Sequence, residues 1–92
     1  MRPPLRTAGE VARWAAARAH ETGEAQVLWV RVVNGGPGYQ LEPEGTAGPR
    51  GGIGWQPVSV ISTEAATAIA GGGYTAWLAL SRLAEEIAAS RG

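Results

Sequence analysis

The segment 25–33, with the sequence AQVLWVRVV, leaves this chain few choices of fold. Its β-branched and aromatic residues are typical of a β-strand. Successive side chains of a strand point to opposite faces of the sheet, and both sets are largely apolar here. Such a strand is covered on both faces, or it presents one apolar face to a partner.

Two further strands are predicted after it. The glycine-rich stretch 34–38 is typical of a turn, so residues 39–42 are expected to return as the second strand of a hairpin. Residues 53–61 indicate a third strand, in which Pro57 lacks the N–H of a ladder donor and therefore favours an edge or a bulge. The Gly/Pro-rich loop 43–52 between them is long for so small a domain.

Helices are predicted on either side of the strands. Thr7 and Glu10 have the spacing of a capping box before a helix over 9–22, which Gly23 is expected to end. Ser62 or Thr63 is expected to cap a short helix over 64–70. After the glycines 71–73, a last helix runs from about residue 74 to 90. Its predicted apolar stripe consists of Trp77, Leu80, Leu83, Ala84, Ile87 and Ala88.

This order predicts a single α+β domain over residues 7–92, preceded by a short extended arm over 1–6. The simplest packing is a three-stranded antiparallel sheet with the helices on one face, in the order α-β-β-β-(short α)-α. In that packing Trp77 is a core residue, and the substitution Trp77→Ala is expected to cost about 3–5 kcal/mol. The opposite face of the sheet is left to solvent or to a partner.

The inventory of reactive side chains excludes several classes of enzyme. The chain has 92 residues and no cysteine, which excludes a disulfide framework, a zinc finger and a thiol nucleophile. Its one histidine, His20, falls near the end of the predicted first helix, where a partly exposed imidazole is common. There is no lysine for a P-loop. We therefore expect no enzyme activity, cofactor, metal site or small-molecule substrate.

The same sequence indicates where the chain resides. No segment approaches the roughly 18 apolar residues of a membrane span. Residues 1–6 also lack the apolar stretch of a signal peptide. We therefore expect no membrane partner and a cytoplasmic location.

A candidate binding surface follows from the alternation of the strands. If Leu28, Val30 and Val32 face the helices, then Trp29 and Arg31 face away. The other residues expected on that outward face or its rim are Val27, Val33, Gln40, Glu42, Trp55 and Ile61, with Arg50 in the neighbouring loop. The residues expected to join the core from the other strands are Tyr39, Leu41, Val58 and Val60. A register shifted by one residue would instead bury one of the tryptophans.

The mixture of aromatic and arginine side chains on that face is typical of interface hot spots. The sequence therefore predicts a non-catalytic domain that binds or occludes a protein partner, or forms a homodimer, through this face. The rival prediction is a nucleic-acid-binding module that uses stacked aromatics with Arg2, Arg6, Arg31 and Arg50. The balance of 8 basic and 8 acidic residues weighs against it, because nucleic-acid binding is driven by phosphate neutralisation.

Two resemblances bear on these alternatives. The helix–three strands–helix order resembles the double-stranded-RNA-binding domain, which implies RNA binding. In that family lysines at the start of the last helix grip phosphates, whereas the matching stretch here, 71–75, reads GGGYT. The size and layout are also similar to small phage-encoded inhibitors, including some anti-CRISPR proteins of type I systems. That resemblance implies inhibition by occlusion of a protein partner.

Overall fold

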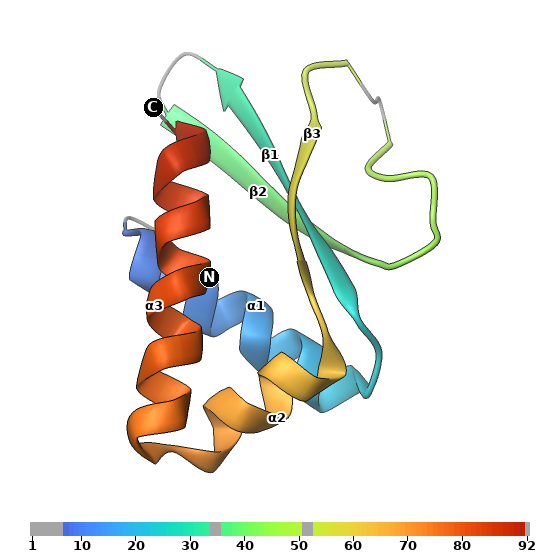
Figure 1. Cartoon of the computed structure of the whole chain (residues 1–92). Helices are drawn as coiled ribbons and strands as arrows, with labels where there is room; N and C mark the ends of the chain where they lie inside the picture. The colour runs from blue at the N-terminus through green and yellow to red at the C-terminus, as the bar shows by residue number, and fades with distance from the viewer. Residues whose placement is uncertain (1–6, 34–35, 51–52, 92) are drawn as a thin grey trace, which may run out of the picture.

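The computed structural model describes residues 7–33, 36–50 and 53–91. Its elements are α1 (Ala8–Thr22), β1 (Gln26–Val33), β2 (Gly36–Pro43), β3 (Gln56–Ile61), α2 (Thr63–Gly71) and α3 (Gly73–Arg91) (Figure 1). The predicted α+β class and element order are confirmed. The predicted arm at 1–6, with Arg2 and Arg6, lies outside the described residues, as do 34–35, 51–52 and the side chain of Val33.

The sheet is antiparallel and has the strand order β2-β1-β3, so β1 is the central strand. β2 begins earlier than predicted and includes Pro37, which an edge strand tolerates. In the β1–β3 ladder Leu28 is opposite Ser59, whereas Trp29 is opposite Pro57. Val58 is therefore an extra residue at a bulge. The prediction that Pro57 marks an edge or a bulge is confirmed on both counts.

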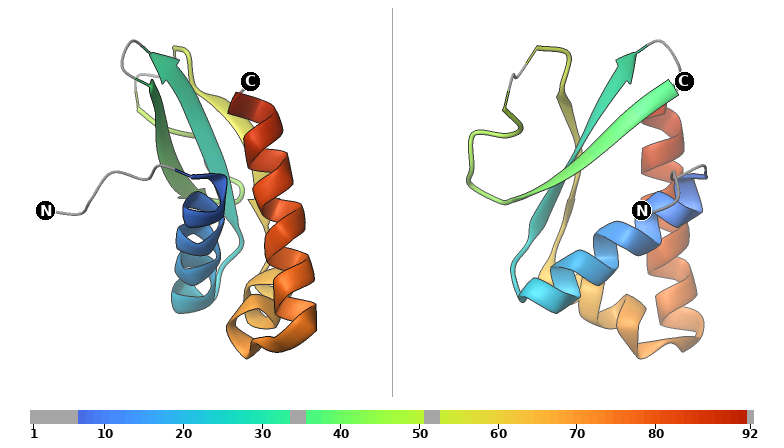
Figure 2. Two further views of the ribbon diagram at one scale, coloured as in Figure 1. Left: turned by 90° about the vertical axis from the view of Figure 1, so that its left-hand side faces the viewer. Right: turned by 180° about the vertical axis from the view of Figure 1, so that it is seen from behind.

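The three helices pack together on one side of the sheet, and Figure 2 shows α1 and α3 lying on that side. Alanines form most of the buried side of α1. The core consists of Val11, Ala12, Ala15, Ala19, Leu28, Val30, Ile61, Ala66, Leu83 and Ile87. Tyr39, Leu41 and Val58 pack against this core, as the strand alternation predicts.

The predicted helix boundaries rest on capping interactions that the structure contains. The N–H of Glu10 donates to Oγ1 of Thr7 at 3.1 Å, and the N–H of Thr7 donates to Oε1 of Glu10 at 3.2 Å. Gly23 ends α1 with a φ of 71°, a left-handed conformation that glycine adopts without strain. Of the two candidates for the cap of α2, Ser62 is the N-cap, since its Oγ accepts from the N–H of Ala65 at 3.0 Å.

The apolar stripe of α3 differs from the prediction at both ends. Leu83 and Ile87 are buried, and Leu80 and Ala84 pack against the core. Trp77, however, is 61% exposed, and Ala88 is exposed as well. Trp77 lies close to the α2–α3 turn, where its ring stacks on Tyr74 with centroids 5.8 Å apart. The prediction that Trp77 is a core residue is wrong.

The faces of two neighbouring β3 residues are also the reverse of the prediction. Ile61, expected on the outward face, is opposite Gln26 and only 1% exposed. Val60, expected in the core, is opposite Val27 and 52% exposed. The bulge at Val58 explains both corrections, because one extra residue shifts the alternation of the strand relative to β1.

Candidate partner-binding face

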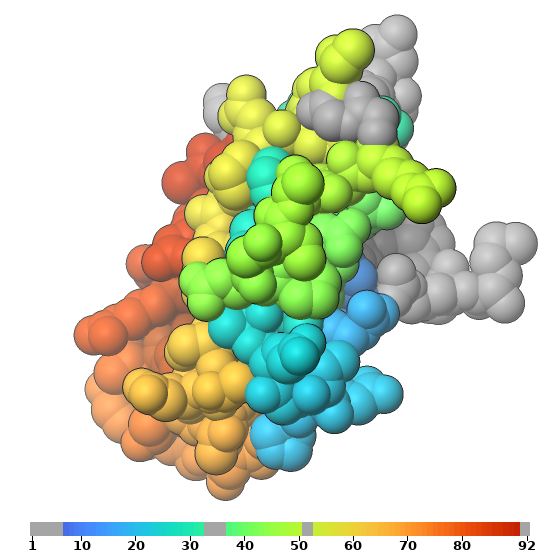
Figure 3. All heavy atoms as spheres, turned by 90° about the vertical axis from the view of Figure 1, so that its right-hand side faces the viewer, coloured from blue at the N-terminus to red at the C-terminus, as the bar shows by residue number. Residues whose placement is uncertain are grey.

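The sheet side away from the helices, called the outer face below, gathers the predicted site residues from three parts of the chain. Trp29 and Arg31 occupy alternate positions of β1, and Gln40 of β2 is opposite Trp29 in the ladder. Glu42 is opposite Val27. The loop residues 44–50 cross this side, as the space-filling view in Figure 3 shows.

Arg31 and Trp55 form the best-defined contact on the outer face. The guanidinium carbon of Arg31 lies 4.9 Å from the centre of the Trp55 ring. The same ring reaches Gly38, the ladder partner of Arg31, where a Cβ would lie 3.7 Å from Cη2 of Trp55. Trp55 thus crosses β1 to touch β2, and it contacts Arg31 through a cation–π interaction.

The aliphatic part of the Arg31 side chain packs against Gly54. A Cβ built on Gly54 would lie 3.3 Å from both Cγ and Cδ of Arg31. In the described part of the chain no carboxylate forms an ion pair with Arg31, and the residue is exposed. The side chain is therefore supported by the loop while its guanidinium stays open to an acidic group on another molecule.

Trp29 is covered by the chain itself, which the sequence analysis did not foresee. A Cβ on Gly48 would lie 2.8 Å from Cζ2 of Trp29, and the neighbouring Pro49 is buried. The indole Nε1 of Trp29 is buried and has no hydrogen-bond partner among the described residues. The ring therefore supports the loop at residues 48–49, and only part of the ring is open to a partner.

The remaining predicted residues surround this contact. Gln40 and Arg50 are exposed, and Glu42 is half-buried. Val60 adds an exposed apolar side chain that sequence analysis assigned to the core. The available outer face is thus the Arg31–Trp55 pair with polar groups around it and the loop beside it.

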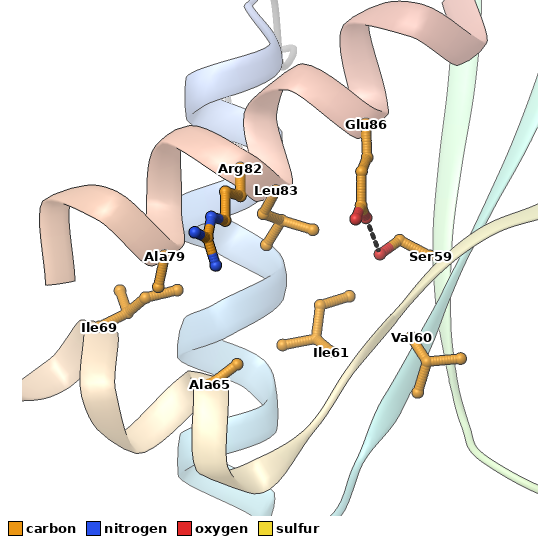
Figure 4. A pocket seen from close by; sticks show the side chains of 9 residues that line it. All are labelled: Ser59, Val60, Ile61, Ala65, Ile69, Ala79, Arg82, Leu83 and Glu86. Carbon is orange, nitrogen blue, oxygen red and sulfur yellow. Dashed lines mark hydrogen bonds between the residues drawn. The ribbon is translucent and has the colours of Figure 1, made fainter. Parts of the chain in front are cut away.

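A second feature was not predicted: a hollow of about 240 Å³ between β3, α2 and α3 (Figure 4). Its apolar lining includes Ile61, Ile69 and Leu83, and Arg82 and Glu86 of α3 stand on one wall. The hydroxyl of Ser59 donates a 2.6 Å hydrogen bond to Oε2 of Glu86.

Reactive groups are sparse in the described residues. His20 is exposed on α1, and no three His, Asp or Glu side chains gather in these residues as a metal site requires. No described helix combines the length and the apolar character needed to cross a membrane.

Comparison with known proteins adds no relative, since no family model, curated protein or solved structure matches this chain.

Proposed function

We propose that this chain is a non-catalytic binding domain that associates with a protein partner through its outer face. The observation that carries the proposal is the Arg31–Trp55 contact. Tryptophan and arginine are enriched among the residues that contribute most binding energy at protein interfaces. A guanidinium already stacked on a ring loses less conformational entropy on binding than a free one.

The partner's surface is expected to combine an acidic side chain with an apolar patch. The acidic group would pair with the guanidinium of Arg31, and the patch would lie against the ring of Trp55. A standard interface covers about 800 Å² on each partner, so the loop 44–50 and the exposed Gln40 would take part. In its more specific form the proposal is an inhibitor, since a bound domain of 9.5 kDa occludes a surface without any chemistry.

The loop over Trp29 favours a different protein over a second copy on this face. Two sheets that pack face to face lie about 10 Å apart. A loop resting on each sheet would hold two copies further apart than that. A partner with a concave or loop-free surface avoids the conflict.

The test compares capture of proteins from cells that encode this chain by four immobilised forms. Wild type and Arg18→Ala are expected to retain the same protein, because Arg18 is exposed on α1, away from the sheet. Arg31→Ala and Trp55→Ala are expected to lose it. Trp29 is a poor choice for substitution because its ring supports the loop.

A salt series separates this proposal from nucleic-acid binding. An aromatic protein interface should persist when salt rises, whereas affinity for duplex RNA or DNA should fall steeply. Retention of the same protein by all four forms would contradict the proposal. The proposal would also be contradicted by a complex with duplex RNA or DNA whose affinity falls with salt and falls by the same factor in Arg18→Ala and in Arg31→Ala.

A further inference from the structure

The second edge of the sheet, formed by β3, is guarded at its start but not along its second half. Edge strands expose unpaired N–H and C=O groups, and proteins commonly guard them with charges, prolines or bulges. β2, the other edge, contains Pro37, Glu42 and Pro43. β3 has Pro57 and the bulge at Val58 in its first half, but the residues after the bulge, 59–61, read SVI and carry no charge. The exposed Val60 lies within that stretch.

The helix flank beside this edge carries one charge of each sign. Arg82 and Glu86 lie one turn apart on the wall of the 240 Å³ hollow next to β3 (Figure 4). Glu86 accepts the hydrogen bond from Ser59, and Arg82 is exposed with no ion pair among the described residues. In Figure 3, β3 lies at the surface between α3 and the loop residues 44–50.

We propose that a second copy of this chain pairs with β3, antiparallel along residues 59–61, to form one continuous sheet through both copies. Symmetry and charge indicate why the partner of β3 is a second copy of this chain. A two-fold axis between the paired strands brings the same patch of both copies together. Arg82 of each copy then approaches Glu86 of the other copy. The dimer therefore contains two equivalent contacts between opposite charges. A chain with no net charge adds no overall repulsion.

The geometry also makes a prediction about Val60. A two-fold axis at Val60, the centre of the 59–61 stretch, places Val60 of one copy beside Val60 of the other on the outer face. Cross-strand pairs of β-branched residues stabilise antiparallel sheets. In this arrangement all helices lie on one side, so both Arg31–Trp55 pairs point the same way. The proposal nevertheless stands independently of the binding function assigned to that pair.

Light scattering after size-exclusion chromatography tests the proposal over a concentration series. Wild type is expected to shift from the monomer mass of 9.5 kDa towards twice that value as concentration rises. Val60→Lys should remain a monomer, because a lysine on an edge strand opposes pairing. Val32→Lys is the matched control, since Val32 is 66% exposed at the far end of β1 and its substitution should leave dimerisation unchanged.

A charge-exchange experiment tests the two-fold contact itself. Arg82→Glu alone and Glu86→Arg alone should each weaken self-association at least several-fold, since each places like charges together. An equimolar mixture of the two variants should associate again, because every contact in the mixed dimer joins opposite charges. A folding defect in either variant, monitored by circular dichroism, could not produce that recovery.

Three results would overturn the proposal. The first is a wild-type monomer across the whole series. The second is a dimer that survives Val60→Lys but dissociates in Arg31→Ala, which would place the contact on the outer face. The third is failure of the mixed variants to associate while both remain folded. Binding of the protein partner is measured in the separate capture experiment with Arg31→Ala and Trp55→Ala. One proposal can therefore fail while the other stands.

Discussion

Gly48 lies so close to Trp29 that a Cβ at position 48 would stand 2.8 Å from Cζ2 of the indole ring. Gly48 also has a φ of +93°, which a residue with a side chain rarely adopts. Position 48 therefore needs glycine for two separate reasons. The contact fixes where the loop residues 44–50 rest on the sheet, and it decides how much of Trp29 a partner can reach.

The substitution Gly48→Ala should lower stability more than Gly45→Ala does. Gly45 has the same φ of +93° but nothing within 4 Å of its Cβ position, so it measures backbone strain alone, about 1–3 kcal/mol. The extra loss at position 48 reports the displaced ring and is expected to be about 1–3 kcal/mol. Urea unfolding of both variants gives the difference, and equal midpoints would contradict the contact.

Arg31 and Trp55 should be energetically coupled. The guanidinium stands 4.9 Å from the ring centre at an exposed site, for which a cation–π interaction contributes about 0.5–1 kcal/mol. A double-mutant cycle with Arg31→Ala, Trp55→Ala and the double variant measures this term. Arg18→Ala with Trp55→Ala serves as the control cycle and should be additive. Additivity in both cycles would mean that the pair is not held together in solution.

How far the sequence predicted this fold depends on whether the signal was local. The cap of α1 was predictable because Thr7 and Glu10 are three residues apart and satisfy each other's backbone groups. The central strand was predictable because residues 25–33 combine β-branched and aromatic side chains. The placement of Trp29 and Arg31 on one side followed from the alternation of β1, and that of Trp55 from the alternation predicted for residues 53–61, although Trp55 lies just before β3.

The features that escaped prediction depend on partners distant in the sequence. The bulge at Val58 is defined by the ladder with β1, so the residues of β3 gave no sign that Val60 and Ile61 would exchange faces. The cover over Trp29 depends on the path of a long loop. The stripe of α3 includes Trp77 by periodicity alone, but α2 packs beside a different side of the helix there, since Ala76 is buried and Trp77 is 61% exposed.

Trp77 now serves as a test of the helix packing. Because it is 61% exposed and Ile87 is fully buried, Trp77→Ala should cost no more than about 1 kcal/mol, whereas Ile87→Ala should cost about 2–5 kcal/mol. Thermal unfolding of the two variants against wild type provides the comparison. A larger loss for Trp77→Ala than for Ile87→Ala would restore the stripe expected from the sequence.

Val60 and Ile61 test the bulge, since they are neighbours on one strand with opposite surroundings. Ile61→Thr removes a buried methyl group and places a hydroxyl in the core, which together should cost about 2–4 kcal/mol. Val60→Thr places its hydroxyl on the exposed side and should change stability by about 0.5 kcal/mol or less. Chemical unfolding is best measured at low protein concentration, where self-association does not contribute. The reverse order of the two losses would mean that β3 runs without the extra residue and that Val60, not Ile61, faces the helices.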